Sequence, residues 1–402
     1  MSSYLPEDVV VRILSCLPPK SLIRFRSVSK AWLFLIGNPD FFSKNLLNQS
    51  ILTQNPTSRL PLILVKATHK SNPGKQIYSF LSHWNLDIVS QVPLNLPESP
   101  DRRFLNSTQC VYYDLKIVAS CNGLLCLYHY YVGTRDIYIW NPFAPSGLNA
   151  LPSVSHHGQP ELTVLTYSVG FGFDPRSNDF KVVRLLAFLS TTASFLLDTH
   201  YEAEVYSMRD GSWRLLDLLV PVNIYSDSPT VSLGGLFLWY LGFHYDEATE
   251  EDETIFAFDF SDEVFRKTRF PDASVFRDYG QCARTLTGLK GSIAMLVFPR
   301  APSNTKFCLD LWVLLEFGVK ESWTRLISIG PLLDVERPLG FWNNGQLFLE
   351  NSEGQLVLYD PYTEIKKNLP IEGVKGSLEV DLYMQSPVAI NGAVEIKGQD
   401  NL

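Results

Sequence analysis

The sequence predicts a small helical unit at the N-terminus, followed by a large all-β body of the propeller type. With 46% apolar and 13% aromatic residues against 19% charged, the 402-residue chain can bury a sizeable core. Its 24 glycines and 25 prolines interrupt long helices and favour short strands joined by tight turns. Apolar residues recur at helical spacing near the N-terminus, whereas aromatic strand-like segments repeat through the rest of the chain.

Charge and compartment signals exclude several classes of protein. The net charge is -8, and residues 1–50 carry +3, which leaves -11 for the remainder. This acidity disfavours a nucleic-acid partner, because such binding depends on neutralising phosphates. The N-terminus has no basic leader, and the longest apolar stretch, Leu233 to Phe243, has 11 residues and three glycines, so we expect neither a signal peptide nor a membrane span. Six cysteines without paired spacing predict reduced, buried thiols and a cytoplasmic or nuclear location, or both.

Residues 1–47 predict three to four short helices. Pro6 suits a helix start, Pro18 and Pro19 stop the first helix, Ser29 can cap the third, and Asn38 precedes Pro39 at the start of the fourth. A unit of about 45 residues is near the lower limit for a stable core without metal or disulfides. Its apolar positions are too many and too widely spread for one small core. We expect part of this surface to contact another protein; the alternative is packing against the C-terminal body.

These residues carry a resemblance. The segment LPEDVVVRILSCLPPKSLIRFRSVSKAWLFLIGNPDFF resembles an F-box over about residues 4 to 46. The resemblance implies docking onto a Skp-family adaptor, which links the protein to a cullin ubiquitin ligase. Carried onto this sequence, the implied adaptor-binding residues are Leu5, Pro6, Ile13, Leu14, Leu17, Pro18, Leu22, Val28 and Trp32.

Two ladders of residues divide the second part of the chain. Strand-like segments end in an aromatic residue at Phe80, Trp140, Tyr206, Phe258, Trp312 and Tyr359, separated by 60, 66, 52, 54 and 47 residues. Glycines before apolar segments recur at Gly123, Gly170, Gly235, Gly291 and Gly345. Such a period suits four-stranded propeller blades and predicts six of them, with the segment Leu378 to Ile390 pairing back into the first blade. The alternative is an irregular β-sandwich array.

This body resembles the plant F-box-associated domain, a degenerate kelch-like β-propeller found in S-locus and defence-regulating branches. The motifs that carry the resemblance are SCNGLLCL, IYIWNPF, VGFGFDPRSNDFKVVRL, AEVYSMRDGSWR, IFAFDFSDEVF, DLWVLLEFGVKESWTRL and GFWNNGQLFLENSEGQLVLYD. Most blades lack the Gly-Gly pair of regular kelch repeats. We therefore divide the chain into an F-box (1–47), a linker with the first propeller strand region (48–74), the propeller (75–391) and a flexible tail (392–402).

No catalytic, metal-binding or cofactor-binding pattern is found. The sequence lacks a Gly-x-Ser-x-Gly elbow, a phosphate-binding loop and a His-Glu-x-x-His pair. An acidic segment stands out as a candidate for steering a basic partner, although a solvated loop also explains it. The candidate substrate-binding residues are Asp246, Glu247, Glu250, Glu251, Asp252, Glu253, Phe276 and Tyr279.

The expected function is therefore that of a non-catalytic substrate receptor in a Skp–cullin–F-box ubiquitin ligase. The F-box would hold the adaptor, and the propeller would hold a protein substrate, for which the acidic body favours a basic partner. An S-locus receptor for ribonucleases and a regulator of immune receptors both fit. The alternatives are a non-degradative scaffold using the same adaptor contact and a propeller hydrolase.

Overall fold

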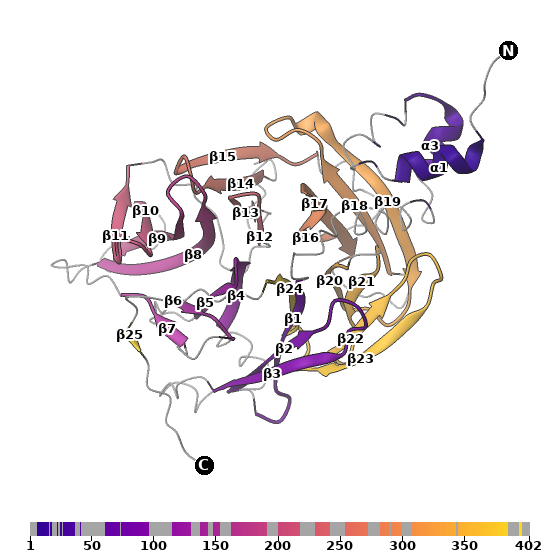
Figure 1. Cartoon of the computed structure of the whole chain (residues 1–402). Helices are drawn as coiled ribbons and strands as arrows, with labels where there is room; N and C mark the ends of the chain where they lie inside the picture. Colours follow the sequence, from indigo (N-terminus) through magenta and orange to yellow (C-terminus); the bar gives the residue numbers. More distant parts are fainter. Residues whose placement is uncertain are drawn as a thin grey trace. The chain divides into compact units, whose positions relative to one another are not determined.

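A computed structural model describes the chain in two kinds of structure: short helices near the N-terminus and antiparallel sheets thereafter (Figure 1). The described residues are 6–15, 17, 22, 25, 27–36, 41, 61–72, 74–95, 115–129, 137–143, 148–152, 162–190, 200–217, 230–241, 254–271, 282–289, 291–299, 307–342, 345–384 and 394–395.

The described residues of the N-terminal part include the helices α1 (Glu7–Ser15) and α3 (Lys30–Ile36). Pro6 directly precedes α1, and its carbonyl accepts the backbone N–H of Val9 and of Val10 at 3.1 Å. Ser29 caps α3 as the sequence predicts, since its Oγ accepts the backbone N–H of Trp32 at 3.1 Å.

The strands form six antiparallel sheets, which are the six blades of the predicted β-propeller. Blade one has the order β24 (Glu379–Tyr383), β1 (Leu62–Thr68), β2 (Lys75–Leu81) and β3 (Ile88–Asn95). Blade two contains β4 (Leu115–Cys121), β5 (Leu124–His129), β6 (Ile137–Trp140), β7 (Leu148–Ala150) and β25 (Val394–Glu395). Blade three contains β8 (Leu162–Asp174), β9 (Asp179–Ser190), β10 (His200–Ser207) and β11 (Ser212–Leu216).

The remaining three blades follow the same order. Blade four contains β12 (Thr230–Leu233), β13 (Leu236–Leu241), β14 (Thr254–Asp259) and β15 (Val264–Arg269). Blade five contains β16 (Cys282–Leu289), β17 (Ser292–Pro299), β18 (Phe307–Leu314) and β19 (Trp323–Leu332), with a short 3₁₀ helix, η4 (Lys320–Ser322), before β19. Blade six contains β20 (Arg337–Phe341), β21 (Leu347–Glu350), β22 (Gln355–Tyr359) and β23 (Lys366–Glu372).

Burial along the strands explains the sequence pattern of the blades. The second strand β5 of blade two is buried at every residue, because both faces of its sheet are covered. The outermost strand β23 of blade six buries only Leu369 and Ile371, and its other five residues are exposed. Continuous apolar runs therefore mark inner strands, and alternating segments mark outer strands.

The six aromatic residues of the ladder occupy the same strand of their respective blades. Its six residues all lie in the third strand of their blade, counted along the sheet order, and all are buried. The six-blade prediction is therefore confirmed, and each blade is anchored by one buried aromatic ring.

The glycine ladder is less uniform than the sequence suggested. Gly123, Gly235, Gly291 and Gly345 have positive φ in the turn between the first two strands of their blades. Gly170 differs, because it lies inside strand β8, where an added Cβ would come within 2.8 Å of Phe237 and 2.9 Å of Trp239. Glycine is needed at position 170 because side chains of blade four pack closely against it, and not because the backbone turns there.

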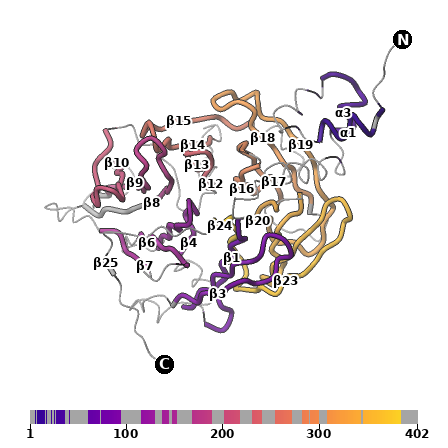
Figure 2. Tube along the Cα trace, viewed as in Figure 1, coloured from indigo at the N-terminus to yellow at the C-terminus, as the bar shows by residue number. Residues whose placement is uncertain are grey.

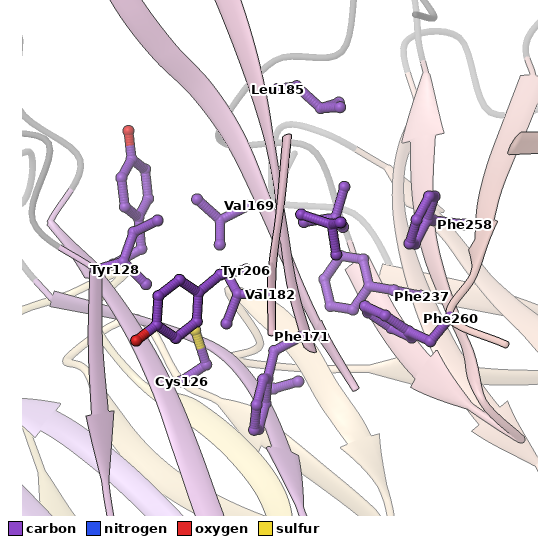
Figure 3. Close-up of a cluster of buried hydrophobic side chains, with 14 of the residues drawn as sticks. Cys126, Tyr128, Val169, Phe171, Val182, Leu185, Tyr206, Phe237, Phe258 and Phe260 are labelled. Atoms are coloured by element: carbon purple, nitrogen blue, oxygen red, sulfur yellow. The ribbon is translucent and has the colours of Figure 1, made fainter. Parts of the chain in front are cut away.

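The chain divides into two compact units, one comprising Met1–Arg59 with Thr268–Val380 and the other Leu60–Lys267 with Asp381–Leu402. In the second unit, blades two, three and four share one hydrophobic core, which includes Tyr206, Phe171 and Phe258 (Figure 3). In the first unit, a separate core joins blades five and six through residues such as Leu311, Leu349 and Tyr359. Each core lies between neighbouring sheets, as stacked blades require.

The C-terminal part of the chain returns to the first two blades. Strand β24 pairs with β1 in blade one, which confirms the predicted return of this segment (Figure 1). The predicted flexible tail, 392–402, differs at Val394–Glu395, which form β25 beside β7 at the edge of blade two (Figure 2). The pairing gives a hydrogen-bond partner to an edge strand. The first propeller strand, β1, begins at Leu62, inside the segment assigned to linker and first strand.

Candidate protein-interaction surfaces

The helical unit has a small core of its own. Leu14, Leu22, Ile36 and Phe41 are each 2% exposed and pack together. Partly buried side chains surround them, namely Val10, Val11, Leu17, Trp32 and Leu35. Among the described residues of the unit these four side chains are the fully buried apolar ones, which is a small core, as its length already indicated.

Large apolar side chains remain on the surface of this unit. Ile13 is 51% exposed, Val28 57% and Phe34 79%. Leu33 and Phe25 are also exposed, and the Phe25 ring meets the Trp32 ring edge-on at 5.7 Å. Exposed apolar side chains gathered on so short a segment are typical of a surface that a partner covers.

The nine predicted adaptor-binding residues separate into four groups. Pro6, Ile13 and Val28 are exposed, while Leu17 and Trp32 are half-buried. Leu5 and Pro18 lie outside the described residues. Leu14 and Leu22 are each 2% exposed and lie in the core of the unit, and their role as adaptor contacts stays a prediction.

The structure adds three exposed residues that the sequence prediction left out: Phe25, Leu33 and Phe34. Their signal was present in the third helix, KAWLFLI, which is apolar on every side and cannot bury all of its faces. The apolar surface that the sequence predicts is present on this unit, and which of its residues contact an adaptor stays a prediction.

The eight predicted substrate-binding residues of the propeller lie outside the described residues. They are Asp246, Glu247, Glu250, Glu251, Asp252, Glu253, Phe276 and Tyr279, and their role stays a prediction.

A buried charge network joins blade three to blade four. The Nζ of Lys181 lies 2.8 Å from Asp174 Oδ2 and 2.8 Å from Glu263 Oε1, and it donates to the carbonyl of Phe260 at 3.0 Å. Burial alone would lower the pKa of Lys181, but the two carboxylates outweigh it and raise the pKa. Every bond of this network connects turns or strands within the propeller, so it stabilises the blades and leaves no unsatisfied acid–base pair for catalysis.

Indole side chains tie the outer strands of neighbouring blades. Trp213 in β11 donates its Nε1–H to the carbonyl of Pro152, just after β7, at 2.8 Å. Trp323 in β19 donates in the same way to the carbonyl of Arg269, at the end of β15, at 3.1 Å. Both tryptophans lie in the fourth strand of their blade, so the two bonds link neighbouring blades in the same way.

Two kinds of feature are absent from the described part of the chain. There is no group of three or more His, Cys, Asp or Glu side chains there that could hold a metal ion. None of its helices has both the length and the apolar character needed to cross a bilayer.

Known families match both parts of the chain. Residues 2–44 match the model of the F-box domain, and residues 78–385 match that of the F-box associated β-propeller domain. An F-box/kelch-repeat protein of Arabidopsis thaliana is 25% identical over 390 residues, covering 96% of each chain. The Arabidopsis F-box protein CPR1 is 25% identical over 404 residues, covering 96% of this chain and 88% of its own.

A solved structure is also similar, at a lower level. It is a DUF4784 family protein from Bacteroides caccae, with a TM-score of 0.38 and 10% identity over 77% of this chain and 70% of that one.

Proposed function

Because the chain belongs to the plant F-box proteins that carry an F-box-associated β-propeller, we propose that it is the substrate receptor of a Skp–cullin–F-box ubiquitin ligase. Proteins with these two domains typically act as substrate adaptors of such ligases, and F-box domains generally bind a Skp-family adaptor and so a cullin. The finer part of the proposal is that this chain binds a basic protein substrate through its propeller and directs it to ubiquitination and degradation.

The single observation that carries the adaptor role is the exposed apolar surface of the helical unit. Ile13 and Val28 are more than half exposed, although both are large apolar residues. Burying such side chains against a partner contributes about 1.5–3 kcal/mol each. A partner would also complete a core that is small when the unit stands alone.

The proposed mechanism places no catalytic residue in this chain, in keeping with the generally non-catalytic role of F-box proteins. The receptor would hold a substrate lysine near a ubiquitin thioester carried by another protein, so the rate would rise through effective concentration. The acidic body supports a basic substrate, because opposite charge speeds encounter between proteins.

The test is co-purification of the full chain with a Skp-family adaptor, followed by a binding titration. Val28→Asp and Ile13→Asp should weaken adaptor binding by at least about tenfold each, since a carboxylate would be buried at the contact. Both sites are exposed, so the free chain should fold as before. Leu14→Asp is a poor test, because a charge in the core would unfold the helical unit itself.

The matched control is Leu215→Asp in β11, whose side chain is 56% exposed against 57% for Val28. It should bind the adaptor like the wild type. Failure of the wild-type chain to bind, or equal binding by the Val28→Asp, Ile13→Asp and control variants, would show that the receptor proposal is wrong. Adaptor binding without any ubiquitinated client would favour the non-degradative scaffold.

A further inference from the structure

Two turns of the second compact unit present an aromatic ring at the same position. The turn after the third strand of blade one places Trp84 two residues after Ser82, whose Oγ accepts the backbone N–H of Trp84 at 3.3 Å. In blade two, Asn141 Oδ1 accepts the backbone N–H of Phe143 at 3.0 Å. Each turn is thus fixed by a side-chain-to-backbone hydrogen bond at its first residue.

The turn itself does not require an aromatic residue. Trp84 and Phe143 each lie three positions after the end of the third strand, and the residue at that place is Asp210 in blade three and Asp262 in blade four. Trp84 is 67% exposed and lies outside the core, whereas the ladder aromatics Phe80 and Trp140 are buried. Phe143 is 40% exposed, so one part of its ring packs on the core and the other stays open to solvent. Large aromatic rings that stay exposed are typical of binding surfaces.

The ring of Phe143 is held in place by two buried aromatic rings. Its ring stacks on Tyr383 with a centroid distance of 5.6 Å and meets Phe80 edge-on at 5.0 Å. Tyr383 is fixed in turn, because its hydroxyl donates to the carbonyl of Gly123 at 2.8 Å and lies 3.1 Å from Asn141 Oδ1. A ring held in place on one side loses little conformational entropy when a partner covers the other side.

The charges around these rings have one sign. In the described stretches 81–90, 121–129, 137–143 and 381–384, the residues of fixed charge are Asp87 and Asp381, with no lysine or arginine. Asp87 is exposed and stands three residues after Trp84. The corresponding turn of blade three differs, because it carries the exposed Arg209 beside the exposed Asp210 and so has charges of both signs. Aromatic rings next to carboxylates complement a partner that carries cations beside apolar groups.

We infer that the turns bearing Trp84 and Phe143 on blades one and two form the docking surface for the substrate, and that the docked segment carries lysine or arginine beside large apolar side chains. This inference deepens the proposed function and rests on it. Trp84 and Phe143 supply the apolar contact, and Asp87 supplies the charge contact.

The experiment uses the full chain, co-purified with its adaptor, and a displayed library of random 12-residue peptides as the probe. Peptides selected by the wild type should be enriched in lysine or arginine together with leucine, phenylalanine or tryptophan. A labelled peptide from this pool should bind about tenfold more weakly or worse to Trp84→Ser, as expected for a central aromatic contact. Asp87→Lys should weaken the same peptide and reduce the salt dependence of its binding.

Controls separate this surface from a general effect on folding. Leu215→Ser removes an exposed apolar side chain from blade three, 56% exposed against 67% for Trp84, and should leave peptide binding unchanged. Phe143→Ser also loses ring contacts with Tyr383, so its result is interpreted beside that of Trp84→Ser, at a site that is 67% exposed. No enrichment, an acidic pool, or equal peptide binding by wild type, Trp84→Ser and Asp87→Lys would each overturn the inference.

Co-purification of the adaptor in the same samples tests the proposed function separately. If the adaptor co-purifies while the peptide results are negative, the docking surface is wrong and the receptor proposal stands. If peptides bind through Trp84 but the adaptor does not co-purify, the receptor proposal fails and the surface remains a binding surface of another kind.

Discussion

The carboxylate of Asp174 is buried between two blades, and its stability depends on donors that come from both. It accepts hydrogen bonds from Lys181 Nζ, Ser177 Oγ and Ser261 Oγ and from the backbone N–H of Arg176. Burial alone would raise the pKa of Asp174, but these donors outweigh it and hold the pKa well below the ordinary value. A charge placed so deeply is stable only while all of its partners are present.

Asp174→Asn should therefore destabilise the propeller. The neutral amide cannot pair with Lys181, and breaking a buried pair on one side costs about 3 kcal/mol. Urea unfolding at neutral pH measures the difference. The control is Asp210→Asn, at an exposed turn residue, which should stay within about 0.5 kcal/mol of the wild type.

The same variant should show a defined dependence on pH. Because the folded pKa of Asp174 is lowered, its stabilisation is complete above the ordinary aspartate pKa of about 3.9 and is lost as the pH falls below that value towards the folded pKa. The stability gap between wild type and Asp174→Asn should thus be constant above about pH 5 and shrink below about pH 4. A gap that does not change with acid would contradict this account.

Glycine at position 172 shows a second effect that single residues have on the fold. An added Cβ there would meet the Phe260 ring of blade four at 2.3 Å. The sequence GFG resembles a fragment of a phosphate-binding fingerprint, but both glycines lie in β8 and make room for aromatic rings of the neighbouring blade. Their identity reflects packing and not a ligand.

At the scale of elements, the outer strands of neighbouring blades are joined by indole hydrogen bonds. Trp213 reaches from blade three to the carbonyl of Pro152 after blade two. Trp323 reaches from blade five to Arg269 at the end of β15 in blade four, where its ring also meets Phe270 edge-on at 4.7 Å. These bonds connect sheets that share no backbone pairing.

Replacing Trp323 by Phe should lower the free energy of unfolding by about 1 kcal/mol, because the N–H donor is lost while much of the ring contact remains. Trp213→Phe, at a half-buried site, should cost less. Thermal unfolding followed by tryptophan fluorescence and circular dichroism measures both. Trp84→Phe, at an exposed turn, is the matched control; equal melting temperatures for all three variants would contradict the role of the bonds.

At the scale of the whole molecule, the C-terminal segment completes the first blade. Strand β24 pairs with β1, and the segment before it is fixed by Arg337, whose Nη2 donates to the carbonyls of Gly376 at 2.8 Å and of Leu378 at 2.6 Å. Glu350 accepts the N–H of Gly376 at 2.6 Å and the Nε–H of Arg337 at 2.8 Å. The chain end is thus part of the fold and not an appendage.

Truncation after Ser377, which removes β24, should leave β1 without its partner and expose a sheet edge. We expect loss of the cooperative thermal transition and the appearance of aggregates in size-exclusion chromatography. Truncation after Met384 keeps β24 and removes only the later residues, so its transition should lie within a few degrees of the wild type. If both truncations behave alike, β24 does not close the blade.

Several features of the fold could be predicted because they depend on neighbours in the sequence. Pro6 and Ser29 mark helix starts through local backbone geometry. The ladder from Phe80 to Tyr359 marks the blades, because each blade repeats the same order of strands and turns. The expected function, a substrate receptor of a ubiquitin ligase, came from the resemblance of local motifs to known families.

The individual contacts could not be predicted in this way. Ile13 and Leu14 are adjacent and both large and apolar, yet one is half exposed and the other buried. Lys181 and Glu263 are 82 residues apart, and Tyr383 and Gly123 are 260 apart. Such pairs depend on how the sheets stack, and no local pattern records them.

The sequence by itself thus determined the division into a helical unit and a propeller and the number of blades, because helical periodicity, strand length and repeat spacing are local properties. The expected partner class came from the resemblance of its motifs to known families. Only the tertiary structure decided which apolar side chains of the helices stay exposed and which turn aromatics face solvent. It also decided which charges are buried in pairs. The physical reason is that exposure depends on what packs over a residue, and that neighbour comes from another element of the chain.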